Sequence, residues 1–170
     1  MGIVKTDVPM TAALCSQTID ALAEAYPCCR KEILTETAFG RPMKALVIGS
    51  GERKVLFTAA HHGNEWITAP LLLKFIEELA EGITTGGTLW GVNAHTIQKA
   101  ATIHTVAMVD PDGVDLVTGG IAPGTLEYAS AESLAARYPG IPFPDGWKAN
   151  LLGVDLNLQY PAGWLMAREI

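Results

Sequence analysis

The stretch KVLFTAAHHGNEWITAPLLLKFIEELAEG, residues 54–82, contains the strongest signals for both fold and function. It begins with a short apolar run, KVLFTAA, which is typical of a buried β-strand. It ends with EWITAPLLLKFIEELAEG, in which Leu72, Phe75 and Leu79 recur at helical spacing and Gly82 is a good C-terminal stop. The polar group HHGNE lies where the strand gives way to the helix. Because ligands of α/β sheets gather at the carboxyl ends of strands, this junction is a candidate site.

The flanking sequence continues the alternation of strands and helices, which predicts an α/β layered fold. Each expected element rests on hydrophobic periodicity and on the Gly and Pro residues that bound it. Working outward, we expect a helix over 11–26 that Pro27 ends, two strands within 31–51 joined by a turn at FGRP, a strand over 101–110 closed by the turn PDG, a helix over 130–138 and a loop over 139–150.

Composition limits the classes of protein that this chain can belong to. The 170 residues are 49% hydrophobic and 18% charged, which suits one folded domain with a real core. A net charge of −6 without clustered Lys and Arg argues against nucleic acid as a partner. No apolar run is long enough to span a membrane. Three cysteines without metal spacing and an N-terminus without a signal-peptide pattern favour reduced thiols in a cytoplasmic protein.

His62 and Glu65 form the clearest chemical pair in the sequence. They lie three residues apart, so one turn of chain can aim an imidazole nitrogen and a carboxylate at the same point. Such a pair suits Zn²⁺, which takes N and O ligands and needs at least one more protein ligand and a water. A purely structural alternative stays open, in which Asn64 caps the following helix, Glu65 favours its first turn and the histidines are partly solvated.

Three segments, in order, resemble the zinc carboxypeptidases of the carboxypeptidase A type. FGRPMKALVIGSG and KVLFTAAHHGNEWITAPLLLKFIEEL look like the start of that domain, VAMVDPDGVDL resembles its N-P-D-G segment, and WKANLLGVDLNLQYPAGW resembles its G-V-D-x-N-R segment. HHGNEW, GVDLNLQYP and PAGW look most like the bacterial γ-D-glutamyl-L-diamino acid endopeptidases, which cut peptidoglycan stem peptides. The resemblance implies a three-layer α/β/α fold with a mixed, mostly parallel sheet, of which residues 1–170 are the N-terminal part.

The resemblance also assigns roles to individual residues. His62 and Glu65 match the first two zinc ligands, and Asp155 matches the carboxylate that holds the ligating imidazole from behind. Asn157 matches the asparagine that binds the terminal carboxylate of the substrate, and Asn64 is a further candidate for substrate contact. Lys148 falls near the arginine that stabilises the oxyanion.

These matched residues have structural alternatives. Asp155 and Asn157 can be turn or cap residues, and Lys148 can be a solvated surface charge. Asp110 and Asp112, on either side of Pro111, fit a tight turn that needs no chemistry.

Two departures from the family pattern affect the expected activity. Leu158 replaces the arginine that pairs with the substrate's terminal carboxylate, which favours endopeptidase over strict exopeptidase activity. The family's third zinc ligand and its general-base glutamate lie beyond the last residue, Ile170. We therefore expect one incompletely held zinc ion, and a chain that is inactive by itself although its parent family hydrolyses peptide bonds with a metal-activated water.

Two alternative functions remain open at this point. One is an N-acyl amino acid hydrolase of the aspartoacylase and succinylglutamate desuccinylase type, which shares the HGNE style of ligand pair. The other is a non-catalytic α/β interaction module. For the peptidase, the expected partners are a peptide or muropeptide substrate and a second copy of the chain, bound through an exposed sheet edge near KVLFTAA or the helix PLLLKFIEEL.

Overall fold

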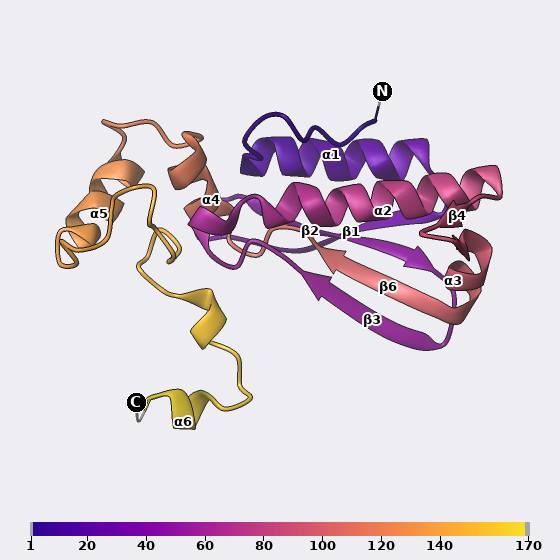
Figure 1. Ribbon diagram of the computed structural model, residues 1–170. Coiled ribbons are helices and arrows are strands. Elements are labelled where there is room, and N and C mark those ends of the chain that lie inside the picture. The colour runs from indigo at the N-terminus through magenta and orange to yellow at the C-terminus, as the bar shows by residue number, and fades with distance from the viewer. Residues whose placement is uncertain (1, 169–170) are drawn as a thin grey trace.

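A four-stranded sheet lies at the centre of the fold in the computed structural model, which describes residues 2–168 (Figure 1). The elements within these residues follow in the order α1 (Ala12–Ala25), β1 (Cys29–Glu36), β2 (Pro42–Gly49), β3 (Arg53–Thr58), η1 (Gly63–Glu65), α2 (Thr68–Thr85), β4 (Thr88–Leu89), β5 (Val92–Asn93), α3 (Ala94–Ala100), β6 (Ala101–Val106), α4 (Pro111–Thr118), α5 (Leu126–Ala135), η2 (Leu156–Leu158) and α6 (Trp164–Arg168). The alternation of strands and helices expected from the sequence is present.

The sheet has the strand order β1-β2-β6-β3. β2 pairs antiparallel with β1 and with β6, whereas β3 pairs parallel with β6, with Val55 opposite Ile103. The prediction of a mixed sheet in an α/β fold is confirmed, while parallel pairing, which was expected to dominate, is confined within residues 2–168 to β3 and β6. β3 lies at one edge of the sheet, and its carboxyl end leads directly into HHGNE.

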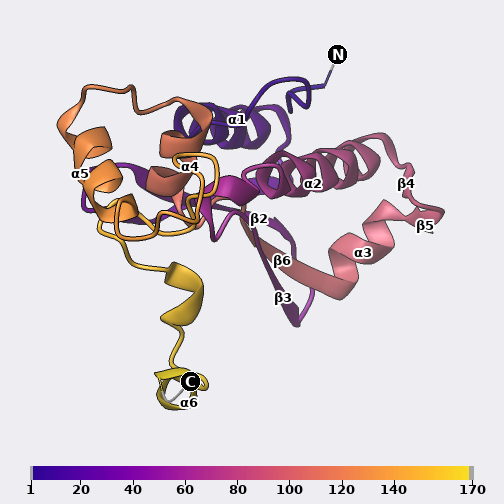
Figure 2. The same ribbon diagram turned by 60° about the vertical axis from the view of Figure 1, so that its left-hand side comes forward.

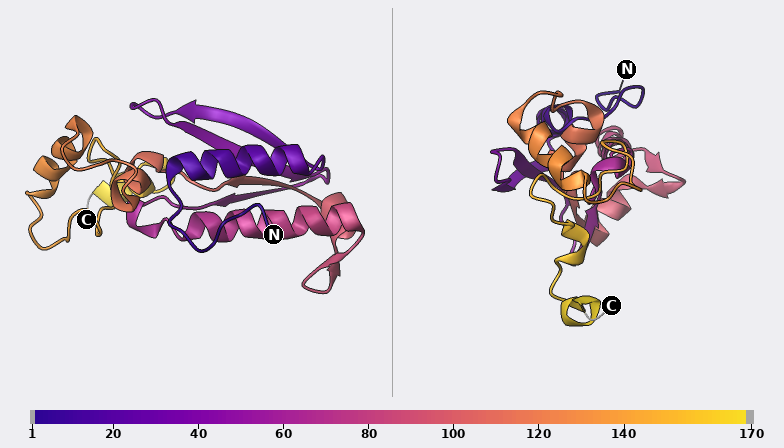
Figure 3. Two further views of the ribbon diagram at one scale, coloured as in Figure 1. Left: turned by 90° about the horizontal axis from the view of Figure 1, so that it is seen from above. Right: turned by 90° about the vertical axis from the view of Figure 1, so that its left-hand side faces the viewer.

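Helices α1 and α2 run side by side over one face of the sheet (Figure 3). Their apolar faces and the inner side chains of β2 and β6 form the main core, which includes the fully buried Leu22, Leu46, Leu73 and Ile76. These two helices form one of the two helical layers that an α/β/α fold requires. A second one does not occur within the described part of the chain, where the helices lie on the α1 and α2 side or beyond the ends of the strands (Figure 1).

The helix after HHGNE starts late, as Pro70 in the sequence allows, and it ends later than the sequence predicts. α2 starts at Thr68, so Pro70 falls in its first turn, where a missing N–H leaves no helical bond unmade. The expected stop at Gly82 is wrong, because the helix continues to Thr85 and is capped by Gly86 with φ 72°. A left-handed residue at this position is the common helix terminator. Gly82 instead packs against α3, where a Cβ atom would lie 3.0 Å from the Ala94 methyl group.

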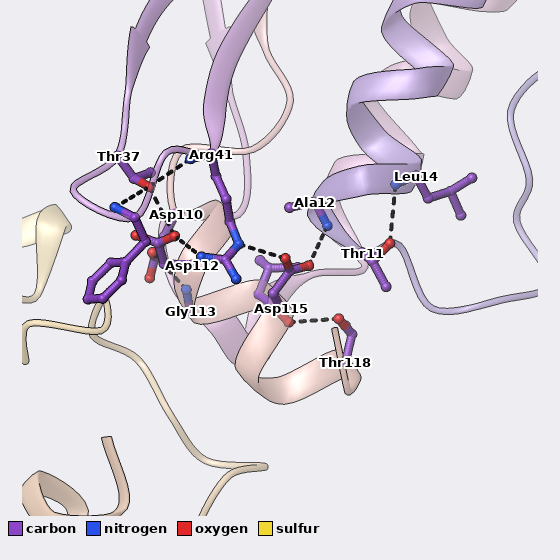
Figure 4. A network of polar contacts seen from close by, with 12 residues as sticks. Thr11, Ala12, Leu14, Thr37, Arg41, Asp110, Asp112, Gly113, Asp115 and Thr118 are labelled. Atoms are coloured by element: carbon purple, nitrogen blue, oxygen red, sulfur yellow. Dashed lines mark hydrogen bonds and ion pairs between the residues drawn. The ribbon is translucent and has the colours of Figure 1, made fainter. Parts of the chain in front are cut away.

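The segment PDG opens a helix, so the expected tight turn is wrong. Asp110 is the N-cap of α4, its side chain accepts a hydrogen bond from Gly113 N at 3.0 Å, and Pro111 is the first helical residue. The helix is fixed by Arg41, whose guanidinium contacts Asp112 at 2.9 Å and Asp115 at 2.8 Å (Figure 4). These bonds tie the turn between β1 and β2 to the start of α4.

A second, smaller apolar cluster joins α4 and α5 to the loop that follows α5. Its buried members are Leu116, Ile121, Ala131, Trp147 and Leu151. This cluster brings the loop over 141–153 back against the end of HHGNE, where Asn64 N donates to Trp147 O at 3.0 Å. Beyond it, η2 and α6 extend away from the sheet (Figure 2). Among residues 2–168, no helix combines the length and the apolar character needed to cross a bilayer.

Candidate metal and substrate site

The candidate site is built where β3 ends. Ala60 has φ 47°, a left-handed conformation that is uncommon outside glycine and that turns the chain sharply into HHGNE. The turn is held from both sides, because Asp110 N donates to Ala60 O and Ala60 N donates to Thr68 Oγ1, each at 2.9 Å. Strain at this point is therefore balanced by bonds to α4 and α2, and it sets the direction of the two histidines.

His62 lies between two carboxylates. Its Nε2 is 3.3 Å from Asp155 Oδ1, and its Nδ1 is 3.1 Å from Glu65 Oε1. The first contact has hydrogen-bond geometry, whereas Nδ1 is buried and has no hydrogen-bond partner within the described residues despite its closeness to Glu65. We assign Nε2–H as the donor to Asp155, because a carboxylate can only accept. The Nδ1 lone pair then faces the same space as the Glu65 carboxylate.

Gly63 lets this loop approach α4 unusually closely. A Cβ atom on Gly63 would lie 2.3 Å from the backbone oxygen of Gly113. A side chain at this position would therefore push η1 away from α4. The same packing buries Asp110, which is 1% exposed and whose Oδ2 has no partner within residues 2–168. Burial raises the pKa of Asp110 to about 7, an effect that the hydrogen bond from Gly113 N partly opposes.

His61 faces the C-terminal part of the described chain. Its Nε2 lies 2.8 Å from the hydroxyl of Tyr160, and the two rings are 5.9 Å apart. Burial lowers the pKa of His61 below its usual value, and the neighbouring His62 lowers it further. This contact ties the segment after η2 to HHGNE, in addition to the bond between Asp155 and His62.

The structure brings some of the other predicted residues to this site and leaves others apart. Asn157 N donates to Asp155 Oδ1 at 3.0 Å, but the Asn157 side chain is exposed. Asn64 is not a helix cap: it lies inside η1, and its Oδ1 is buried without a hydrogen-bond partner among the described residues. Lys148 is exposed, and no contact within residues 2–168 joins it to His62 or Glu65.

Sequence reasoning missed two participants. Asp110 had a usable signal, since an Asp directly before a Pro is the common start of a helix, with the Asp as N-cap and the Pro as first residue. Tyr160 had none, because its contact with His61 depends on how the segment after Asp155 folds back. Leu158, the residue in place of the family's arginine, is half exposed and points to no polar partner.

The pair His62 and Glu65 fits part of a zinc site. Two ligands about 2.0–2.1 Å from a tetrahedral zinc ion are roughly 3.3 Å apart, close to the 3.1 Å between Nδ1 and Oε1. An unpartnered buried imidazole nitrogen and a second carboxylate on the far nitrogen are the other expected features of a ligating histidine. Within residues 2–168, no third His, Cys, Asp or Glu converges on this point, so the described donor set is incomplete.

A mixed α/β fold with a His and Glu pair at a strand end is compatible with a zinc peptidase. The zinc carboxypeptidase family profile matches residues 15–169, and the chain belongs to this family. Among curated relatives, γ-D-glutamyl-L-diamino acid endopeptidase 1 of Lysinibacillus sphaericus is 34% identical over 146 residues, which cover 86% of this chain and 36% of that protein. The protein YqgT of Bacillus subtilis is 31% identical, over 86% of this chain and 39% of its own.

Solved structures agree on the fold. The metallo-carboxypeptidase from Burkholderia cenocepacia superposes with a TM-score of 0.53 at 19% sequence identity, covering 90% of this chain and 36% of that one. The family resemblance predicted from sequence is therefore confirmed. The chain spans between a third and two fifths of the length of these curated relatives.

Proposed function

We propose that this chain is the N-terminal part, residues 1–170, of a single catalytic domain that hydrolyses γ-D-glutamyl-diamino acid peptides of the peptidoglycan type. The observation that carries the proposal is the convergence of His62 Nδ1 and Glu65 Oε1, with Asp155 behind the imidazole. The similarity to an endopeptidase named for γ-D-glutamyl-L-diamino acid substrates supports the choice of peptide. Leu158 supports internal cleavage, because a leucine cannot pair with a terminal carboxylate.

Each candidate residue would have a separate role in the proposed reaction. Zinc, when bound, supplies Lewis acidity that polarises a carbonyl and lowers the pKa of water. His62 and Glu65 would hold it, and Asp155 fixes the imidazole in the tautomer with a free Nδ1 lone pair. Lys148 would place a positive charge near the scissile carbonyl, where negative charge develops. Asn64 and Asn157 would contribute amide groups to the peptide.

Because no third ligand converges on the pair within residues 2–168, we expect no peptide hydrolysis by the 170-residue chain alone. A missing general base alone costs on the order of a hundredfold or more in rate. The test incubates the purified chain, with zinc, with γ-D-glutamyl-L-lysine peptides and follows both binding and cleavage. Binding without cleavage is the expected result. Turnover that Glu65→Ala abolishes would show that the site is complete.

The same binding experiment, repeated with an N-acyl amino acid, distinguishes the peptidase from an N-acyl amino acid hydrolase. An N-acyl amino acid hydrolase should bind N-acetyl-L-aspartate and ignore the γ-glutamyl peptide. The order of the segments PDG and DLNLQYP along the chain favours the peptidase. Preference for the N-acyl amino acid would therefore replace the peptide assignment while leaving the metal site in place.

A further inference from the structure

A cavity of about 480 Å³ lies between α5 and the loop over 141–153. This volume is within the range of small-molecule pockets in proteins. The cavity is lined mainly by apolar groups from both segments, with Tyr138, Phe143 and Trp147 as its aromatic members. It is separate from the space between His62 and Glu65, neither of which lines it.

The base of the cavity is rigid. The rings of Phe143 and Trp147 meet edge to face with centroids 5.7 Å apart, and Tyr128 packs against Phe143 in the same way at 5.3 Å. Trp147 is buried and belongs to the second apolar cluster, together with Leu116 and Leu151. The aromatic wall is therefore preformed, so little conformational entropy would be lost when a ligand binds.

Two cations without carboxylate partners line the cavity. Arg137 and Lys148 both contribute to its wall, and neither forms an ion pair with any residue from 2 to 168. Five other cations among residues 2–168 form ion pairs, including Arg41 with two aspartates and Lys44 with Asp20 at 2.7 Å, whereas four others form none. What distinguishes Arg137 and Lys148 is therefore that both line the same apolar cavity. An apolar pocket with two unpaired positive charges complements a ligand that has both an aliphatic part and a carboxylate.

The cavity reaches the candidate metal site through Asp155. This residue lines the cavity, and its Oδ1 is the group that contacts His62 Nε2. Among the described residues, Asp155 is the one carboxylate in the wall. Its Oδ1 also accepts a hydrogen bond from Asn157 N. A peptide whose scissile bond lies near His62 can therefore place a neighbouring group in the cavity.

We propose that this cavity binds a carboxylate-bearing group of the peptide substrate, with Arg137 as the specificity-determining cation and the Trp147 wall as the apolar contact. The proposal rests on the proposed peptidase function for its choice of ligand. It concerns residues that the zinc assignment does not use, because within residues 2–168 neither Arg137 nor Trp147 forms a hydrogen bond or an ion pair with His62 or Glu65. Binding here can therefore be measured without metal.

The test titrates the chain, in EDTA, with γ-D-glutamyl-L-lysine and with its analogue in which both carboxyl groups are amidated. The NMR signal of the Trp147 indole N–H, assigned by Trp147→Phe, reports on the wall of the cavity. We expect a saturable shift at millimolar peptide, and a weaker response to the amidated analogue. Arg137→Gln should raise the Kd for the acid roughly three- to tenfold, as expected for loss of one charge-assisted contact near the surface, and should leave the Kd for the amide unchanged.

Matched controls make the outcome decisive. Arg30→Gln removes an exposed arginine that pairs with Glu32 far from the cavity, and it should not change the Kd. Arg137→Lys should restore most of the affinity if charge is what matters. No shift of the Trp147 signal, or equal effects of Arg137→Gln and Arg30→Gln, would overturn the proposal. Zinc binding by His62 and Glu65 could still hold in that case, so the two failures are distinguishable.

Discussion

Helix α4 contributes buried carboxylates to two regions of the molecule that differ in one respect. At the Arg41 corner, which comprises Arg41, Asp112, Asp115 and Thr37, each carboxylate is paired (Figure 4). Asp112 Oδ1 accepts from Thr37 and Arg41, and the two oxygens of Asp115 accept from Ala12 N and Arg41. At the start of α4, beside HHGNE, Asp110 Oδ2 is buried and has no hydrogen-bond partner among residues 2–168. The same is true of His62 Nδ1. Since buried polar groups are nearly always paired, the corner is built for stability, and the unpaired groups mark the region where a ligand is to be expected.

The largest expected effect is at the paired region. Arg41→Ala leaves Asp112 and Asp115 buried without their cation, and we expect the free energy of unfolding to fall by about 3–5 kcal/mol. Urea denaturation followed by circular dichroism measures this. Arg30→Ala is the matched control, because its contact with Glu32 is exposed and should contribute less than about 1 kcal/mol. Similar losses in the two variants would mean that the Arg41 corner contributes no more than a surface ion pair.

The second-largest expected effect is a pH dependence of stability that arises from the unpaired carboxyl group of Asp110. The pKa of Asp110 is about 7 in the folded chain and about 3.8 when unfolded, so the folded state holds its proton more tightly. The free energy of unfolding should therefore fall as pH rises through this interval, by up to about 4 kcal/mol. Asp110→Asn removes the titrating group and can still accept from Gly113 N. We expect this variant to lose the Asp110-dependent fall in stability and to be more stable than the wild type near neutral pH.

Thermal melts from acidic to neutral pH, in EDTA, check this prediction. Asp145→Asn is the control, since Asp145 is an exposed carboxylate in the loop after α5. A wild-type profile that stays flat over the interval would show that Asp110 is compensated by a group or a water that pairs with Oδ2. The contrast between the two regions would then disappear.

The two edges of the sheet, neither of which is paired on its outer side within residues 2–168, differ in charge and regularity. β1 exposes two apolar side chains, Ile33 and Leu34, but it carries three charged residues in a row, residues 30–32, and has a register shift after Ile33. These two features discourage pairing with another chain. β3 exposes Leu56 and Phe57, and within residues 2–168 no strand pairs with its outer side. Arg53 and Lys54 lie at the start of β3. In an antiparallel pair of β3 strands, the basic residues of one copy would lie at the opposite end from those of the other, so like charges do not oppose self-association.

We therefore expect a dimer or higher oligomer through β3. Leu56→Lys should weaken association about tenfold, as expected for loss of one apolar contact across the interface. Leu126→Lys is the control, because Leu126 is an exposed leucine on α5. Sedimentation velocity checks this. A monodisperse wild-type monomer at micromolar concentrations, with cooperative unfolding, would contradict the proposal that this edge associates.

The sequence was sufficient for much of the fold and for the central pair of the site. Periodicity and punctuation located α1, β1, β2, β3 and β6. The expectation that KVLFTAA is a buried strand is wrong, because β3 lies at the edge of the sheet and exposes Leu56 and Phe57. The end of α2 was misplaced, since Gly82 and Gly86 are both plausible terminators and only backbone conformation separates them. α4 was missed because Pro-Asp-Gly was interpreted as a turn, although the Asp before Pro111 is a usable signal for a helix start.

Positions that depend on long-range packing could not be predicted. The spacing of HGNE indicated that His62 and Glu65 could converge, but the placement of Asp155 needed the family motif, since it lies far away in sequence. The contact of His61 with Tyr160 had no signal at all. The cavity beside Asp155 arises from how the loop over 141–153 packs on α5, and no periodic pattern describes that packing.

The central claim is that the unpaired His62 Nδ1 and the Glu65 carboxylate hold zinc, and equilibrium dialysis against Zn²⁺ tests it most directly. We predict that the 170-residue chain binds one ion, that His62→Ala and Glu65→Ala abolish binding, and that Asp155→Asn weakens it by about 10- to 100-fold through loss of the contact to Nε2. His95→Ala, which removes an exposed histidine bonded to Gln98, should have no effect. Absence of zinc at saturating concentration, or equal binding by wild type and Glu65→Ala, would contradict the account and favour a non-catalytic module.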